Sequence, residues 1–315
     1  MKVLVTGGAG FIGSHIVDSL IMQGHEVAII DNLSHGFKSN INGQARFYNA
    51  DIRDRCIHSI FKEFKPEALY HHAAQVKVPS SIDNPINDAD INILGTINLL
   101  EACRKNGVRK VIYPSSAAIF GNPKYLPVDE KHPLNMISPY GISKHSVEHY
   151  LKVYKELFGI SYTVLIYANV YGPRQDSTGE GGVIAIFADR FSHNRAVSVF
   201  GNGEQTRDFV YVEDVAAANI EALRGLNDEN YNVCTNQGMS ISNLLKVFKR
   251  LTARDMIIQY EAPREGDIIH SYMSYDKIKE ACGWKPQIDI ETGIWNTLKY
   301  FERKIKPVWE EVGIC

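Results

Sequence analysis

Apolar residues recur along the chain in short runs, and longer stretches with helical periodicity separate these runs. The short runs predict strands, and the stretches between them predict amphipathic helices. This alternation is typical of a doubly wound parallel sheet, an α/β fold. The expected strands span residues 2–6, 26–30, 46–49, 68–71, 109–114 and 162–167, and the expected helices span 11–23, 55–64, 88–106 and 140–157.

The alternation breaks at about residue 169, where turns rich in Gly and Pro separate shorter apolar runs. We therefore expect a first domain over residues 1–168 and a smaller α/β lobe over 169–315. Residues 207–224 combine a short apolar run with a helical pattern, which predicts that the chain rejoins the first domain there. A chain of 315 residues is long enough to form two such units.

The most specific local signal lies between the first expected strand and the first expected helix. Gly7, Gly10 and Gly13 follow the strand in the spacing G-x-x-G-x-x-G. Glycines in such a turn let the backbone approach a phosphate, and the helix that begins there directs unpaired N–H groups at the anion. Glycines also gather in ordinary turns, but this strand, turn and helix together predict a site for a dinucleotide pyrophosphate.

Asp31 closes the second expected strand, at about the distance beyond the glycines that a ribose-binding carboxylate has. A carboxylate accepts hydrogen bonds from both ribose hydroxyls, but it repels a 2′-phosphate. No arginine occurs in residues 32–37 to neutralise such a phosphate. NAD is therefore favoured over NADP as the cofactor.

Charge and cysteine usage argue against several other classes of protein. The formal net charge of −2 offers no strong field for nucleic acid or an anionic membrane. The five cysteines are scattered, which indicates neither a disulfide framework nor a metal site, and we expect a reducing, cytoplasmic environment. A strand expected from residue 2 leaves no room for a signal peptide, and no apolar run approaches the ~20 residues of a membrane span.

Candidate catalytic residues lie in the middle third of the chain. Tyr140 and Lys144 are four residues apart in an expected helix, so they share one face. A neighbouring ammonium and a nicotinamide cation stabilise a phenolate, so we expect the pKa of Tyr140 to be lowered enough for it to act as a base near neutral pH. Ser116 follows the strand expected over 109–114, at the sheet edge where such folds bind ligands. Its hydroxyl can contact the reacting oxygen of a substrate.

Taken together, these segments resemble the extended short-chain dehydrogenase/reductase family, and within it the UDP-glucose 4-epimerases. The resemblance covers nearly the whole chain. It is carried by the glycine segment 6–13, the pair Asp31–Asn32, the segment HHAAQ at 71–75, the Tyr-x-x-x-Lys spacing of 140–144 and the segment YANVYGPR at 167–174. The resemblance implies a Rossmann fold, NAD as cofactor and an isomerase.

The resemblance also implies a role for each matching residue. The catalytic residues would be Ser116, Tyr140 and Lys144. The cofactor would contact Gly7, Gly10, Phe11, Ile12, Gly13, Asp31, Asn32, Asp51, Ile52, His72, Ala73, Ala74, Gln75, Asn92, Tyr140, Lys144 and Tyr167. A UDP-sugar would contact Ser116, Asn169, Val183, Ser198, Phe200, Arg207, Arg264, Asp267 and Ser271.

The activity implied is an NAD-dependent 4-epimerisation that interconverts UDP-glucose and UDP-galactose through a 4-keto sugar. Arg207 and Arg264 would hold the diphosphate through paired charge-assisted hydrogen bonds, while the hexose stays mobile enough to present its other face. Ser271 lies where a bulky Tyr in the family excludes an N-acetyl group. A small residue there predicts that the N-acetylated sugars are accepted as well.

Departures from the family pattern bear on the alternatives. Related dehydratases carry an Asp-Glu pair after the catalytic hydroxyl residue, whereas this chain has Ala117–Ala118, which cannot carry protons. Pro114 and Ala118 replace a frequent Ser or Thr, and Phe120 replaces a frequent Tyr. A UDP-glucuronate 4-epimerase or decarboxylase remains an alternative because Arg174 could bind the extra carboxylate. A non-catalytic NAD-binding protein is the second alternative.

The expected helices 88–106 and 140–157 carry apolar residues on more than one face. Related enzymes pair these helices in a four-helix contact between subunits, so we expect a homodimer. We expect no nucleic-acid or membrane partner. The apolar residues concerned are Ile91, Leu94, Leu99, Val147, Tyr150 and Val153.

Overall fold

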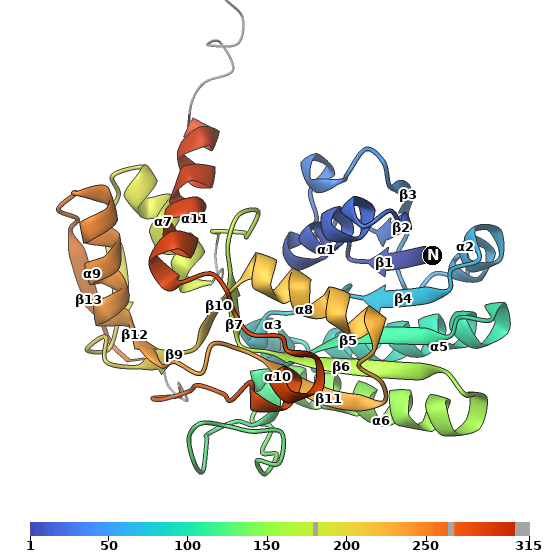
Figure 1. The fold of residues 1–315 in the computed structure, drawn as a ribbon. Helices are drawn as coiled ribbons and strands as arrows, with labels where there is room; N and C mark the ends of the chain where they lie inside the picture. Colours follow the sequence, from blue (N-terminus) through green and yellow to red (C-terminus); the bar gives the residue numbers. More distant parts are fainter. Residues whose placement is uncertain (179–181, 264–267, 306–315) are drawn as a thin grey trace, which may run out of the picture.

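A computed structural model describes residues 1–178, 182–263 and 268–305. Its centre is a sheet of seven parallel strands in the order β11-β6-β5-β4-β1-β2-β3 (Figure 1). This sheet confirms the expected α/β Rossmann fold. The strands are β1 (Lys2–Thr6), β2 (Glu26–Asp31), β3 (Arg46–Asn49), β4 (Ala68–His71), β5 (Lys110–Ser116), β6 (Ser161–Tyr167) and β11 (Glu229–Val233).

Helices cover both faces of the sheet, which explains why its central strands are apolar throughout. On one face, α1 (Phe11–Met22) and α8 (Val212–Arg224) pack against each other and share a core with Val3 and Val5. On the other face, α2 (Ile57–Phe64), α5 (Gly95–Asn106) and α6 (Pro139–Phe158) share a core with Leu4.

A second lobe has a core of its own beside the sheet (Figure 1). Its helices pack on a parallel pair of strands, and two further strand pairs connect this lobe to the rest. The helices are α7 (Val183–Ser192), α9 (Ile241–Thr252) and α11 (Ile290–Ile305). The strand pairs are β8 (Val197–Phe200) with β13 (Ile258–Glu261), β7 (Asn169–Tyr171) with β10 (Phe209–Tyr211), and β9 (Thr206–Arg207) with β12 (Met239–Ser240).

The six strands expected from the sequence are confirmed to within two residues. The helix expected over 88–106 is instead divided into α4 (Pro85–Ala89), a wide π-helical turn η2 (Asp90–Leu94) and α5. Asn92 lies in this turn and bonds to the backbone of Gln75, a contact that no helical periodicity encodes. Among the described residues, no helix combines the length and apolar character needed to cross a membrane.

The chain returns to the sheet after its first entry into the second lobe. Helix α8 packs on α1, and β11 pairs with β6 to extend the sheet. Strand β11 was not expected from the sequence, because Asn230 and Asn232 interrupt its apolar run. Asn232 is nevertheless fully buried, because its side-chain amide donates to the carbonyl oxygens of Val128 (3.0 Å) and Ser274 (3.1 Å).

Candidate active site

The turn after β1 has the shape that a phosphate site requires. Gly7 has a φ of +69°, and a Cβ there would lie 2.7 Å from the backbone nitrogen of Ala73. A Cβ on Gly13 would lie 2.2 Å from the carbonyl oxygen of Gly7, so neither position accepts a side chain. Helix α1 begins at Phe11, after Gly10, without a side-chain cap. The first N–H groups of α1 therefore have no acceptor within the helix and suit a bound anion.

Asp31 is buried at the end of β2, beside this turn. Its Oδ2 accepts from the backbone N–H of Ala9 (3.0 Å), and its Oδ1 accepts from that of Leu33 (2.8 Å). A Cβ on Gly36 would lie 2.9 Å from Asp31 Oδ1, so the loop closes tightly over the carboxylate. These donors orient Asp31 and leave further lone pairs on both oxygens to accept from ribose hydroxyls.

The carboxylate of Asp51 is bound by Arg53, a partner that was not expected from the sequence. Arg53 binds both of its oxygens at 2.8 Å, and the side chain of Asn32 donates to Oδ2 at 2.8 Å. The hydrogen bonds from Arg53 lower the pKa of Asp51 to about 2. Both oxygens of the Asp51 carboxylate therefore already accept hydrogen bonds within the protein. An adenine contact from this segment would use the backbone of Asp51 or the neighbouring Ile52.

His71 links the glycine turn to η2 through a chain of hydrogen bonds. The N–H of Ala73 donates to Thr6 Oγ1 (3.2 Å), whose hydroxyl lies 2.8 Å from His71 Nδ1. His71 Nε2 lies 2.8 Å from Thr96 Oγ1, which in turn donates to the carbonyl oxygen of Asn92 (2.5 Å). Because Thr96 gives its proton to that carbonyl, it accepts from His71, and the imidazole is held with its proton on Nε2.

Asn92 extends this connection to α6, the helix that carries Tyr140 and Lys144. Its Oδ1 accepts from the N–H of Gln75 (2.9 Å), and its Nδ2 lies within 3.1 Å of three acceptors: Gln75 O, Asp88 Oδ1 and Ser143 Oγ. The segment expected to line the cofactor is thus tied to α6. Asp88 is a buried residue of this group that the sequence analysis did not identify, because a single Asp in a helix carries no recognisable pattern.

The structure brings Ser116, Tyr140 and Lys144 together at the carboxyl end of β5. Helix α6 begins after Ser138, whose side chain accepts from the N–H of Gly141 (3.2 Å), and this cap fixes the first turn that carries Tyr140. The side chains of Ser116 and Tyr140 are hydrogen-bonded to each other. Tyr140 is 8% exposed and Lys144 is 3% exposed. The three candidate catalytic side chains therefore form one group, in which Tyr140 and Lys144 are buried and Ser116 is half-buried.

Burial shifts the pKa values of this group in opposite directions. It raises the pKa of Tyr140 to about 12, against the effect of the hydrogen bond with Ser116, and it lowers the pKa of Lys144 to about 7. The expected fall in the pKa of Tyr140 included the charge of a nicotinamide cation, so it stays a prediction for the cofactor-bound protein. Desolvation outweighs the interaction with Ser116, so a lowered pKa of Tyr140 requires an additional positive charge beside it.

The residues expected to contact a sugar nucleotide lie on several elements of the second lobe. Arg207, in β9, donates through Nη1 to the carbonyl oxygens of Thr206 (2.9 Å) and Ile268 (2.6 Å). The N–H of Ser271 donates to the same carbonyl of Thr206 (3.3 Å), so Arg207 and Ser271 are neighbours. The expected residues Arg264 and Asp267 lie outside the described residues. The remaining expected contacts are Asn169 in β7, Val183 at the start of α7, and Ser198 and Phe200 in β8.

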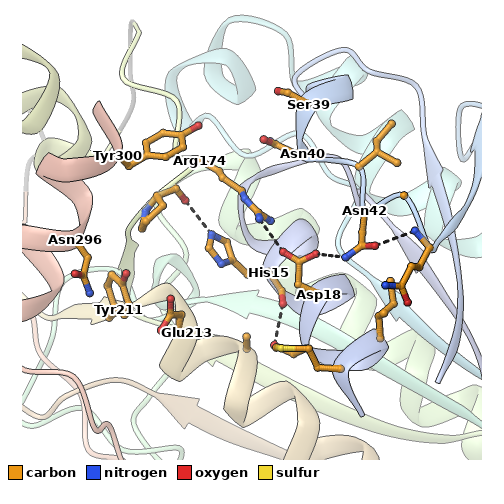
Figure 2. A pocket seen from close by; sticks show the side chains of 18 of the residues that line it. His15, Asp18, Ser39, Asn40, Asn42, Arg174, Tyr211, Glu213, Asn296 and Tyr300 are labelled. Carbon is orange, nitrogen blue, oxygen red and sulfur yellow. Dashed lines mark hydrogen bonds and ion pairs between the residues drawn. The ribbon is translucent and has the colours of Figure 1, made fainter. Parts of the chain in front are cut away.

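A separate cavity of about 1030 Å³ lies beside α1 (Figure 2). Arg174 has a left-handed φ of +70° and forms an ion pair with Asp18 across this cavity, with a separation of 2.7 Å between Nη2 and Oδ2. His15 Nε2 lies 3.0 Å from the carbonyl oxygen of Pro173, and Asn42 donates to Asp18 Oδ1 (2.8 Å). These contacts join the segment after β7 to α1. The lining of the cavity contains none of the three candidate catalytic residues.

Comparisons with known proteins agree with this geometry. A UDP-glucose 4-epimerase of Mycolicibacterium smegmatis is 39% identical over 311 residues, which cover 96% of this chain and 99% of the relative. A structure of UDP-glucose 4-epimerase with UDP-glucose from Thermotoga maritima is 45% identical, covers 97% of this chain and 100% of its own, and superposes with a TM-score of 0.95.

Two further solved structures extend the similarity. UDP-glucose 4-epimerase of Thermus thermophilus in complex with NAD is 42% identical, with a TM-score of 0.91 and coverage of 96% of this chain and 99% of its own. UDP-N-acetylglucosamine 4-epimerase of Methanobrevibacter ruminantium, in complex with UDP-N-acetylmuramic acid, is 35% identical, with a TM-score of 0.92 and coverage of 96% and 99%.

The sequence model of one family matches residues 3–234, which include the glycine turn, Asp31 and all three candidate catalytic residues. This match confirms the resemblance inferred from the motifs, and it confirms NAD as the cofactor of the family. The chain belongs to the NAD dependent epimerase/dehydratase family.

Proposed function

We propose that the protein is an NAD-dependent UDP-hexose 4-epimerase that interconverts UDP-glucose and UDP-galactose. The proposal rests above all on the grouping of Ser116, Tyr140 and Lys144 at the carboxyl edge of the sheet, where Tyr140 and Lys144 are buried. The chain is also similar, over nearly its whole length, to proteins named UDP-glucose 4-epimerase. Ala117 and Ala118 supply no acid or base for a dehydration, which favours epimerisation within the family.

Each member of this group has a distinct task in the proposed reaction. Tyr140 takes the proton from the 4-hydroxyl of the sugar and later returns it to the 4-keto oxygen. Ser116, which is hydrogen-bonded to Tyr140, holds that oxygen in place. The Lys144 side chain favours the phenolate through its positive charge. NAD, when bound, supplies the hydride acceptor for C4 and the donor for its return.

Inversion at C4 also requires the hexose to turn over between the two hydride transfers. Arg207 is a suitable anchor for the diphosphate because a guanidinium binds phosphate oxygens through parallel hydrogen bonds. Asn169 is exposed at the start of β7, where its amide can meet the sugar nucleotide. Binding energy directed to the nucleotide leaves the sugar free to rotate.

Incubation of the purified protein with UDP-glucose or UDP-glucuronate tests this proposal, with products separated by chromatography. We expect UDP-galactose from the first and no product from the second. Arg174, the cation that a uronate substrate would need, is already paired with Asp18. Turnover of UDP-glucuronate alone would favour the uronate alternative, and no turnover of either sugar would favour a non-catalytic NAD-binding protein.

The N-acetylated sugars are a second proposed substrate pair. Ser271 is small and half-buried beside Arg207, so we expect room for a 2-acetamido group. The similarity to a UDP-N-acetylglucosamine 4-epimerase supports this extension. We expect Ser271→Tyr to lower kcat/KM for UDP-N-acetylglucosamine at least about tenfold more than for UDP-glucose, because a bulky ring would fill that space. Equal losses for both sugars, or a wild type inactive on the N-acetylated sugar, would contradict it.

The subunits are proposed to pair through α6 and the neighbouring turn η2. One face of α6 is buried, and the opposite face exposes an apolar stripe of Ile142, Tyr150, Val153 and Leu157. Leu94 in η2 is also largely exposed. A second copy of the chain would remove these side chains from water across a two-fold axis.

A cytoplasmic location is proposed as well. Cys103 and Cys234 are buried and free, and Cys282 is free and half-buried. Thiols that remain unpaired suit a reducing compartment.

A further inference from the structure

Asp208 is a buried carboxylate that the proposed mechanism does not use. It lies between β9 and β10 and is 2% exposed. Its Oδ1 accepts from the backbone N–H (2.8 Å) and the hydroxyl (2.6 Å) of Thr235. Its Oδ2 accepts from the backbone N–H groups of Asn236 (3.1 Å) and Met273 (3.2 Å). All four groups donate, so they suit an ionised carboxylate, whose burial without such donors would be costly.

One of the two segments held by this carboxylate leads into β12. Thr235 and Asn236 lie shortly before β12, which pairs with β9 in antiparallel orientation, so that Met239 lies opposite Arg207. Asp208 follows Arg207 directly in the chain. Its carboxylate therefore joins the end of β9 to the start of the segment that runs beside it.

The other segment carries Ser271 along the opposite edge of β9. The N–H of Thr206 donates to the carbonyl oxygen of Ile269 (2.9 Å), and the N–H of Ser271 donates to the carbonyl oxygen of Thr206 (3.3 Å). Met273, which donates to Asp208, lies two residues beyond Ser271 and is buried. The carboxylate thus binds both neighbours of β9 at the point where this strand ends.

The backbone of Asp208 contacts a third residue of the expected sugar side. Its carbonyl oxygen accepts from the N–H of Asn169 (2.9 Å), at the start of β7. Arg207, Asn169 and Ser271 come from separate parts of the chain, and each lies within two residues of a hydrogen bond made by Asp208. The relative placement of these three residues therefore depends on Asp208.

We propose that Asp208 is a positioning residue for sugar-nucleotide binding, and that its carboxylate sets the spacing between the segments that carry Arg207 and Ser271. The inference rests on the proposed function and adds a residue that acts on it from beneath the site. Asp208 is not expected to touch the substrate, because its oxygens are buried and already accept four hydrogen bonds. Without the carboxylate, a sugar nucleotide would have to order both segments as it binds, which lowers affinity.

Asp208→Ala tests the proposal through the dissociation constant for UDP, measured by calorimetry on the NAD-loaded protein. We expect UDP binding to weaken about tenfold, a size typical of coupling between separate groups, while the NAD content stays that of the wild type. Alanine is preferred to asparagine, whose carbonyl oxygen could still accept from Asn236 and Met273.

Asp214→Ala is the matched control. Asp214 is also a buried carboxylate, 4% exposed, that accepts from two backbone N–H groups, those of Gln287 (2.9 Å) and Ile288 (3.1 Å). None of these partners is an expected sugar contact. We expect this variant to lose stability and to keep the affinity of the wild type for UDP.

Hydrogen exchange in the wild type is a second readout, which decides the question even if Asp208→Ala does not fold. Coupling is reciprocal, so if the hydrogen bonds of Asp208 favour UDP binding, bound UDP must stabilise those bonds. We expect UDP to slow exchange of the N–H groups of Asn236 and Met273 more than that of Gln287 and Ile288.

Three results would overturn the proposal. One is an Asp208→Ala protein that binds UDP as tightly as the wild type. Another is equal weakening in Asp208→Ala and Asp214→Ala, because a general loss of stability would then explain both. The third is exchange at Asn236 and Met273 that UDP does not slow. A wild type that binds no UDP would instead contradict the proposed function, so the two failures are distinguishable.

Discussion

Tyr140 and Lys144 share a buried face of α6. Their pKa values depend on this burial and on the charge of a cofactor bound beside them. Burial raises the pKa of the Tyr140 hydroxyl to about 12, and it lowers the pKa of the Lys144 ammonium to about 7. Both shifts disfavour the charged forms that base catalysis needs. A bound nicotinamide cation would favour the phenolate, which makes acid-base chemistry at Tyr140 conditional on a loaded cofactor site.

Tyr140→Phe tests the role of this hydroxyl. The substitution keeps the ring and removes the proton acceptor, so we expect kcat for UDP-glucose to fall by a factor on the order of 10² or more, with little change in UDP affinity. Tyr125→Phe, at a surface tyrosine that bonds to Asp129, is the control and is expected to retain full turnover. A Tyr140→Phe protein that keeps most of its kcat would remove Tyr140 from the mechanism.

The lowered pKa of His71 predicts that the free energy of unfolding depends on pH. Burial lowers its pKa in the folded protein to about 3, whereas its ordinary value is 6.5. Between these values the unfolded chain binds more protons than the folded one, so the free energy of unfolding falls as the pH falls from 6.5. At pH ~5.5 the loss from one such histidine is about 1.4 kcal/mol, and it nearly vanishes at pH ~7.5.

Urea unfolding of the wild type and His71→Gln at these two pH values checks this prediction. We expect the variant to lose about 1.4 kcal/mol less than the wild type when the pH is lowered, because glutamine does not titrate. Other histidines contribute equally to both proteins and cancel in the comparison. If both proteins lost the same free energy of unfolding, the pKa of His71 would not be lowered in the folded protein.

Residues whose spacing carries information were predictable from the sequence, whereas residues defined by their contacts were not. The four-residue separation of Tyr140 and Lys144 is visible in the chain, because the helix period alone puts them on one face. Asn219 with Tyr167 and Asn92 with Ser143 are partners from distant segments. No local pattern encodes such pairs, so they required the folded structure.

At the scale of elements, α6 combines two tasks on opposite faces. Its inward face carries Tyr140 and Lys144, and it packs through Val147 and Leu151 into the core. Its outward face carries the apolar stripe proposed as the subunit contact. Leu99 and Val147, which were expected among the contact residues, are instead fully buried within the subunit. Periodicity showed that two faces were apolar, and only packing could show which face remained exposed.

Val153→Glu tests the proposed contact. Val153 lies within the stripe and is 45% exposed in the single chain, so we expect a charge there to shift the mass measured by light scattering at micromolar concentration from dimer to monomer. Lys152→Glu, which introduces the same side chain beside the stripe, is expected to leave the dimer intact. A monomeric wild type would contradict the proposal, and so would a Val153→Glu variant that stays dimeric.

At the scale of the whole molecule, the candidate site joins a sheet to a second lobe. The cofactor side comes from the carboxyl ends of β1, β2, β4 and β5, as expected for a doubly wound fold. The proposed sugar side would come from β7, β9 and the segment around Ser271. The ion pair between Arg174 and Asp18, together with the bond between His15 and Pro173, ties these two parts together.

The overall fold was predictable to different degrees in the two halves of the chain. Buried parallel strands read as continuous apolar runs, so six of the seven strands of the main sheet followed from the sequence. The second lobe is built from short strands such as β9 and β12, of two residues each, which are too short to show a period. Their pairing depends on contacts across the chain, and these contacts decide where Arg207 and Ser271 lie.

The fate of the hydrogen at C4 tests the central claim most directly. The purified protein would be incubated with UDP-glucose deuterated at C4, without added NAD, and the product analysed by mass spectrometry and nuclear magnetic resonance. If the cofactor stays bound and the hydride returns to the carbon it left, UDP-galactose will form with deuterium retained at C4. The account is contradicted if the label is lost to solvent, or if an oxidised sugar accumulates only in proportion to added NAD.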